Sequence, residues 1–182
     1  MKKHNNNIAW IVSVILIAVI IVMAIALYPY VKYNKTYEDK LIKTNFSDYL
    51  STKDYVKINF DVGPNIMIFK DQKDKCNGII MPINDVQTNT INQGINKKID
   101  TSPTIHDIII DVFDNYNISI EMVKITELRN NIYYANLILR QDDRILNIDI
   151  KPSDAVALAS RVGLDIYFKK DLFNRNAQNI CK

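Results

Sequence analysis

Residues 151–163 read Lys-Pro-Ser-Asp-Ala-Val-Ala-Leu-Ala-Ser-Arg-Val-Gly, and this stretch predicts a short, tightly packed helix. Pro152 and Ser153 are typical of a helix start, and Asp154 would place a carboxylate at the positive end of the helix dipole. Gly163 suits the left-handed conformation that often follows the last helical residue. The predicted apolar face, with spacing i, i+3, i+4, i+7, consists of Ala155, Leu158, Ala159 and Val162.

The rest of the chain from residue 55 onward alternates between short strands and helices. Pro103 is expected at the first helical position of the helix near residue 104, and Thr104 with Asp107 resembles a capping box. Strands that follow one another through tight turns, with helices outside them, predict an α+β fold with a mainly antiparallel sheet and flanking helices. The expected strands are 55–62, 66–69, 78–83, 118–128, 132–140, 144–150 and 164–168, and the other helices are 85–95 and 170–177.

An apolar stretch near the N-terminus, Ile8–Leu27, is interrupted only by Ser13 and is long enough to cross a bilayer as one helix. We therefore expect a single-pass membrane protein. The chain then divides into flanking residues and a transmembrane anchor at 1–31, a membrane-proximal linker at 32–54, and one folded domain at 55–182.

A cleaved signal peptide is the alternative to an anchor, because Lys2 and Lys3 precede the stretch and Ala24-Ile25-Ala26 fits a cleavage pattern. The stretch exceeds the about 7–15 apolar residues of a signal peptide, which favours the anchor. Lysines also follow the stretch, so the positive-inside rule slightly favours a cytoplasmic domain, although large domains cross membranes regardless of flanking charge. These lysines are Lys32, Lys35, Lys40 and Lys43.

The net charge of +3 for the 182 residues does not come from the folded part. From residue 51 onward the chain carries 17 Lys and Arg and 17 Asp and Glu. A neutral domain argues against tight nonspecific binding to duplex nucleic acid, which depends on basic residues that neutralise phosphates. Cys76 and Cys181 are far apart and lack C-x-x-C spacing, so they are either two free thiols or one disulfide.

His106 and Asp107 form the first candidate cluster, near the start of their predicted helix. The apolar stripe of that helix consists of Ile105, Ile108, Ile109, Val112, Phe113 and Tyr116. His106 lies off this stripe, so we expect it to be exposed or in a cleft. The plainer interpretation is a helix cap beside an ordinary surface histidine. His106 is also the one histidine after residue 4, which excludes a histidine-rich zinc site.

Asp149, Lys151, Asp154 and Arg161 form the second candidate cluster, at a junction between a strand and a helix. Carboxylates beside a cation can hold Mg²⁺ or Mn²⁺ and a phosphate together. The plainer interpretation is a capping Asp154 that pairs with Lys151 or Arg161.

Four segments of the chain resemble the bifunctional nuclease (DNase/RNase) domain family. Residues 151–159 resemble its Arg-Pro-Ser-Asp-Ala-Ile-Ala-Leu-Ala signature, and residues 103–107 resemble its Pro-x-Thr-His-Asp segment. Residues 123–135 resemble its hairpin, and Pro82-Ile83 resembles its Pro-Ile strand end. The order matches from about residue 55 to residue 173. The resemblance implies a compact α+β domain, usually oligomeric and associated with cleavage of DNA and RNA.

The chain departs from the family pattern at three places. Lys151 stands where the family usually has arginine, which keeps the charge and loses the two-pronged grip on phosphate. Gln87 or Asn89 falls near the expected glutamate, and Ser102 stands where an arginine often precedes the proline.

We therefore expect a membrane-anchored, metal-dependent nuclease with nucleic acid as its substrate and further copies of itself as partners. The expected catalytic residues are His106, Asp107, Asp149 and Asp154, with His106 as general base or acid. Asp149 and Asp154 would bind Mg²⁺ or Mn²⁺, while Lys151, Ser153 and Arg161 would bind the substrate. The alternative is a membrane-tethered binding or scaffold domain of the same fold that has lost the chemistry.

Overall fold

The computed structural model describes residues 5–42, 46–99 and 102–181, and the chain forms two compact units, Met1–Thr44 and Asn45–Lys182. The first unit contains α1 (Asn5–Ile42), whose segment Trp10–Pro29 is long and apolar enough to cross a membrane. A signal sequence near the N-terminus can meet the same criteria of length and apolar composition. Helix α1 continues to Ile42, over residues that the sequence pattern assigns to the linker. The division of the chain into an anchor at 1–31, a linker at 32–54 and a domain at 55–182 stays a prediction.

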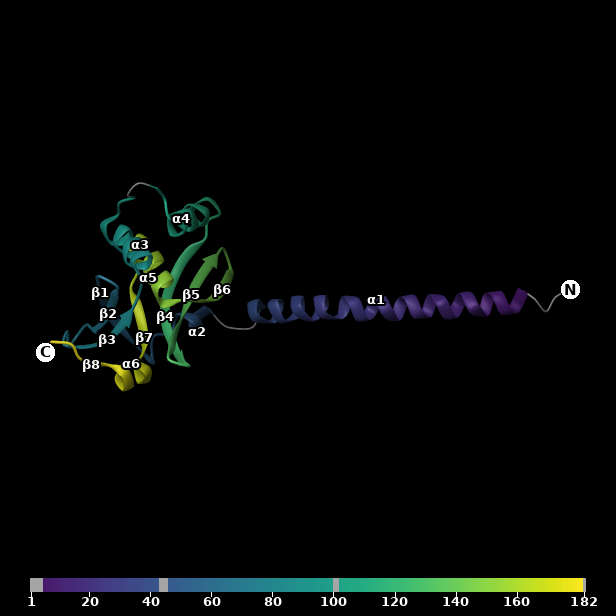
Figure 1. The fold of residues 1–182 in the computed structure, drawn as a ribbon, viewed down its shortest axis with the longest axis horizontal. Helices are drawn as coiled ribbons and strands as arrows, with labels where there is room; N and C mark the ends of the chain where they lie inside the picture. The colour runs from purple at the N-terminus through teal and green to yellow at the C-terminus, as the bar shows by residue number, and fades with distance from the viewer. Residues whose placement is uncertain (1–4, 43–45, 100–101, 182) are drawn as a thin grey trace. The chain divides into compact units, whose positions relative to one another are not determined.

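The second unit is built on one eight-stranded sheet in the order β6-β5-β4-β7-β1-β2-β3-β8 (Figure 1). All neighbouring strands are antiparallel except β4 and β7, which are parallel. The short strand β7 thus joins two antiparallel groups, and the predicted α+β fold is confirmed. The strands are β1 (Tyr55–Gly63), β2 (Ile66–Asp71), β3 (Asn77–Pro82), β4 (Ser119–Arg129), β5 (Ile132–Gln141), β6 (Arg144–Ile150), β7 (Ile166–Lys169) and β8 (Gln178–Asn179).

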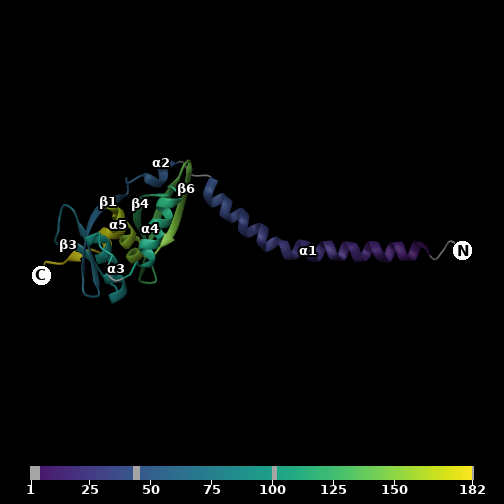
Figure 2. The same ribbon diagram turned by 90° about the horizontal axis from the view of Figure 1, so that it is seen from above.

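Three helices of this unit gather together and position the candidate site (Figures 1 and 2). They are α3 (Asp85–Asn96), α4 (Ile105–Asn115) and α5 (Pro152–Val162), while α2 (Phe46–Leu50) and α6 (Lys170–Asn176) lie elsewhere on the sheet. Asn84 and Gln87 form a capping box at the start of α3. The capping box predicted for α4 is also present, but the helix begins at Ile105, so Pro103 precedes it.

Helix α5 lies at the centre of the core, because its residues are small enough to pack closely on every side. Ala155, Val156, Ala157 and Ala159 are completely buried, and α5 contacts α3, α4, β4 and β5. The helix is therefore buried beyond the single apolar face that the sequence predicts, whereas Val162, assigned to that face, is 45% exposed. Gly163 adopts the expected left-handed conformation after the helix.

Gly94 on α3 lies close against α5. A Cβ atom at this position would lie 2.1 Å from Ser160 Oγ and 3.2 Å from the Ala157 carbonyl oxygen. Both contacts are too short, and the carbonyl belongs to the backbone of α5. The absence of a side chain at residue 94 therefore allows the two helices to pack.

We expect Gly94→Ala to lower the melting temperature, because overpacking costs about 1–3 kcal/mol and better helix propensity returns only about 1 kcal/mol. Thermal unfolding of the full chain in detergent would measure the change. The double variant Gly94→Ala/Ser160→Ala removes the 2.1 Å contact and should recover part of the loss. An unchanged or higher melting temperature for Gly94→Ala would contradict the close approach.

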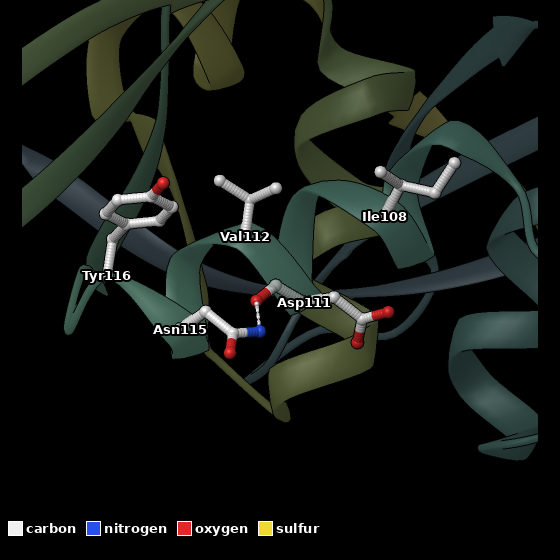
Figure 3. Close-up of a pocket in the computed structure, with 5 residues that line it drawn as sticks. All are labelled: Ile108, Asp111, Val112, Asn115 and Tyr116. Atoms are coloured by element: carbon white, nitrogen blue, oxygen red, sulfur yellow. Dashed lines mark hydrogen bonds between the residues drawn. The ribbon is translucent and has the colours of Figure 1, made fainter.

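Helix α4 is rotated relative to the prediction from its apolar stripe. Ile105, Ile108, Val112 and Tyr116 are all at least 44% exposed, and Figure 3 shows the last three around a shallow hollow on the outer side of the helix. The face turned to α5 contains His106 together with the partly buried Ile109, Ile110 and Phe113. In this orientation of α4, the His106 ring contacts residues of both α3 and α5.

Candidate functional site

Arg161, near the end of α5, connects the three helices through its guanidinium group. Its Nε donates to Asp107 Oδ1 at 2.6 Å, and Nη1 donates to the carbonyl oxygens of Thr90 and Ala157 at 3.0 and 2.8 Å. Nη2 donates to the hydroxyl oxygens of Thr90 and Thr104 at 3.2 and 3.0 Å. The Arg161 side chain is 7% exposed, so every nitrogen is engaged inside the protein.

Asp107 accepts hydrogen bonds at both carboxylate oxygens. Oδ1 faces Arg161, and Oδ2 accepts from the backbone N–H and the hydroxyl of Thr104, each at 2.7 Å. The Asp107 carboxylate therefore completes the α4 cap and neutralises Arg161 at once. The hydrogen bond from Arg161 is the main cause that lowers the pKa of Asp107 to about 2.

His106 connects this arrangement to Asp154. Its Nε2 lies 3.4 Å from Asp154 Oδ1, and its Nδ1 lies 3.1 Å from Thr90 Oγ1. A neutral ring with its proton on Nε2 donates to the carboxylate and accepts from the threonine hydroxyl. Hereafter the interhelical cluster denotes the residues Thr90, Thr104, His106, Asp107, Asp154 and Arg161.

Exposure divides the interhelical cluster into a buried part and one accessible group. The side chain of His106 is 9% exposed, and that of Asp154 is 37% exposed. Of the two expected positions for His106, exposed or in a cleft, the exposed one is wrong, since the ring is enclosed between helices. Asp154 pairs with His106, and Arg161 pairs with Asp107, so the plainer interpretation, in which Asp154 pairs with Lys151 or Arg161, is wrong.

The pKa of His106 is lowered from its ordinary value, chiefly because burial disfavours the charged ring, and nearby Arg161 acts in the same direction. Asp154 and Asp107 oppose the shift and do not overcome it. The ring is therefore neutral near pH 7. In this state it lies beside the Asp154 carboxylate without adding a positive charge.

Acid should destabilise the domain in two stages. The pKa values of His106 and Asp107 are both lower in the folded protein than in the unfolded chain, so the unfolded state binds more protons as the pH falls. The His106 contribution is present above about pH 6.5 and is lost below it, and the Asp107 contribution is lost between about pH 4 and 2.

Melting temperature measured against pH would check this expectation. In His106→Gln the decrease between about pH 6.5 and 5 should shrink, because the titrating ring is absent. The decrease at lower pH should remain, since Asp107 is unchanged. Equal slopes for the wild type and His106→Gln above pH 5 would contradict the assignment to His106.

Gln87 and Ser153 extend the site toward the start of α5. Gln87 Nε2 donates to Ser153 Oγ at 2.7 Å, and Gln87 Oε1 accepts from the backbone N–H of Asn84. Gln87 thereby holds the starts of α3 and α5 together, which the sequence did not show. Thr90 was missed too, because a threonine within an unremarkable helix gives no signal of its tertiary partners.

Asp149 lies outside the interhelical cluster, although the sequence placed it in the same site as Asp154. It is exposed on β6, where its carboxylate accepts from Asn136 Nδ2 on β5 at 2.9 Å. Lys151 is the exposed residue just before α5 and caps the helix with its backbone only. The structure therefore unites His106, Asp107, Asp154 and Arg161, and sets Asp149 apart.

The described residues do not form a ready metal centre. Among them, no group of three or more His, Cys, Asp or Glu side chains is arranged to hold a metal ion. Asp107 is committed to Arg161 and Thr104, so Asp154 is the one accessible carboxylate of the interhelical cluster. This donor set does not fit a dedicated protein cage for Mg²⁺ or Mn²⁺.

The match to known families decides the classification of this fold. The family model described as bifunctional nuclease domain matches residues 67–180, from β2 to the end of β8. The chain belongs to the bifunctional nuclease domain family. The matched residues include all six members of the interhelical cluster. In this chain the bifunctional nuclease domain therefore contains the interhelical cluster, and family membership supports a nuclease-like function.

Two curated relatives show how far the sequence likeness extends. An uncharacterized protein of Mycobacterium tuberculosis is 38% identical over 68 residues, which are 37% of this chain and 40% of the relative. Bifunctional nuclease 1 of Oryza sativa subsp. indica is 26% identical over 83 residues, which are 44% of this chain and 25% of the relative. The matches thus span less than half of either relative.

Proposed function

We propose that this bifunctional nuclease domain hydrolyses phosphodiester bonds of nucleic acid at the start of α5. The observation that carries the proposal is the contact between Asp154 and His106, in which the carboxylate is accessible and the imidazole is buried. Family membership supports the reaction class. Asp154 is then the catalytic residue, and His106 is a positioning residue that acts through it.

The proposed chemistry needs a base, a phosphate site and water. Asp154 accepts a proton from the water that attacks phosphorus, the new P–O bond forms, and the bond to the leaving nucleotide oxygen breaks. Solvent returns a proton to the leaving oxygen. Lys151 and the positive end of the α5 dipole attract the phosphate, because a helix N-terminus carries partial positive charge.

Arg161 has a different role from the one expected. Its burial and five hydrogen bonds keep the guanidinium away from any substrate. We propose that Arg161 and Asp107 hold the helices so that His106 meets Asp154. Ser153 is also buried and paired with Gln87, so Lys151 is the one exposed residue of the three assigned to substrate binding.

A cleavage assay tests the proposed function directly. Full-length protein in detergent is incubated with end-labelled single-stranded RNA and DNA, with Mg²⁺ or Mn²⁺ and with EDTA. Cleavage that depends on protein supports the proposal, and no cleavage of either substrate under any of these conditions overturns it. Metal dependence stays a prediction for the EDTA arm, and no step above relies on a metal.

Replacing Lys151 should weaken substrate binding without affecting the fold. We expect Lys151→Gln to raise KM several-fold at low salt, because the removed charge faces solvent at the phosphate site. The melting temperature should stay unchanged, and Lys151→Arg should restore KM. An unchanged KM in Lys151→Gln would place the phosphate elsewhere.

The apolar segment Trp10–Pro29 supports anchoring in a membrane as a further part of the proposal. Mass spectrometry of the protein recovered from membranes distinguishes an intact anchor from cleavage after Ala26. Light scattering of the detergent-solubilised protein tests the expected homo-oligomer. A scaffold domain without catalysis is the second candidate function, favoured by the fully satisfied hydrogen bonds of Arg161.

A further inference from the structure

The two cysteines of the chain are joined in one disulfide. Cys76 and Cys181 are separated by 105 residues, and their Cα atoms lie 5.1 Å apart, within the range for disulfides. Cys76 directly precedes β3, and Cys181 follows β8. The bridge therefore attaches the C-terminal tail to the edge of the sheet.

The backbone brings these cysteines together independently of the sulfur atoms. Strand β8 pairs with the start of β3, and the N–H of Ile180 donates to the carbonyl oxygen of Cys76 at 2.8 Å. Gly78 makes room for the tail, because a Cβ there would lie 2.9 Å from Ile180 Cδ1 and 2.7 Å from the Phe69 carbonyl oxygen. The C-terminal tail therefore pairs with β3 and packs closely over Gly78.

We propose that the folded domain resides on the oxidising, non-cytoplasmic side of its membrane. Disulfides persist in oxidising compartments and are rare in the cytosol, where thiols are kept reduced. The helical segment Trp10–Pro29 provides the means of export, as an anchor or as a signal. This placement is opposite to the slight cytoplasmic preference from the flanking lysines. That preference is weak, because large domains cross membranes regardless of flanking charge.

Formation of the bond requires an oxidant in that compartment. A disulfide-bearing oxidoreductase supplies it by thiol–disulfide exchange: the thiols of Cys76 and Cys181 lose two protons and two electrons, and the disulfide of the oxidoreductase becomes a dithiol. If the proposed function holds, the substrate of the domain is nucleic acid outside the cytoplasm.

Thiol trapping of the full chain in a bacterial host tests the placement. Cells are lysed in denaturant with N-ethylmaleimide, and the protein is treated with maleimide-polyethylene glycol with or without prior reduction. We expect no gel shift without reduction and a shift of two polymer chains after reduction. Cys181→Ser should give no shift in either lane, because its single free thiol is blocked by N-ethylmaleimide at lysis.

Two further measurements complete the test. A variant lacking residues 8–27 stays in the cytoplasm, and it should also give no shift after reduction, because both of its thiols are blocked at lysis. Protease added to sealed spheroplasts should digest the domain of the full chain. Reduced thiols in the full chain, or a domain protected in sealed spheroplasts, would overturn the placement. Neither readout uses cleavage of nucleic acid, so an oxidised, accessible domain without nuclease activity would reject only the proposed function.

Discussion

Replacing Arg161 with methionine should lower the free energy of unfolding by about 3–5 kcal/mol, the usual cost of removing one partner of a buried ion pair. The substitution would leave Asp107 with one unpaired oxygen and would leave the Thr90 carbonyl and two threonine hydroxyls with fewer partners. Methionine fills a similar volume, so the loss of unfolding free energy comes from polar groups left without partners rather than from a cavity. Urea unfolding of the full chain in detergent, followed by near-ultraviolet circular dichroism, measures it.

The double variant Arg161→Met/Asp107→Asn provides the control for this prediction. Asparagine removes the buried charge and can still accept the N–H of Thr104 at the α4 cap. We therefore expect the double variant to lose less unfolding free energy than the two single variants lose in sum, with a coupling of at least about 1 kcal/mol. Additive losses, or a loss below about 1 kcal/mol for Arg161→Met, would show that the ion pair does not hold the helices together.

Replacing Asp154 with asparagine should reduce the rate of nucleic-acid cleavage by about 100-fold or more, the usual contribution of a general base. An amide cannot accept the proton of the attacking water. The melting temperature should change little, because the Asp154 side chain is 37% exposed and its contact with the neutral His106 ring is 3.4 Å long. Steady-state cleavage and thermal unfolding, measured on the same preparation, separate these effects.

Asp114→Asn is the matched control, since it makes the same carboxylate-to-amide change at an exposed position of α4. His106→Gln should reduce cleavage less than Asp154→Asn and should shift the pH–rate profile, because the ring acts through the carboxylate. Full activity in Asp154→Asn would remove Asp154 from catalysis. A lower melting temperature without any cleavage by the wild type would favour the scaffold function instead.

Local sequence patterns determined most of the secondary structure. Alternating apolar residues predicted β1, turn residues between apolar runs predicted the strands up to β7, and capping signals located the starts of α4 and α5. These features depend on neighbours within a few residues, which the sequence displays directly. Strand β8 escaped prediction, because two residues carry no periodicity and are ordered by pairing with β3 and by the bridge to Cys76.

The candidate site shows where local patterns stop being sufficient. The sequence placed His106 and Asp107 in one candidate cluster and Asp154 and Arg161 in another, and the structure brings these residues together. Their roles in catalysis stay a prediction. The sequence paired them wrongly and added Asp149, because the position of α4 on α5 depends on contacts between residues more than 50 positions apart. The sequence also left His106 either exposed or in a cleft, since the apolar stripe of α4 lay on the other face.

By itself, the sequence determined the α+β class, the apolar N-terminal segment, the family resemblance and the acidic start of α5. The tertiary structure alone decided which cation meets which carboxylate, which of these groups reaches solvent, and whether the two cysteines join. The physical reason is that propensity and periodicity act along the chain, whereas burial and hydrogen-bond partners are set when distant helices pack.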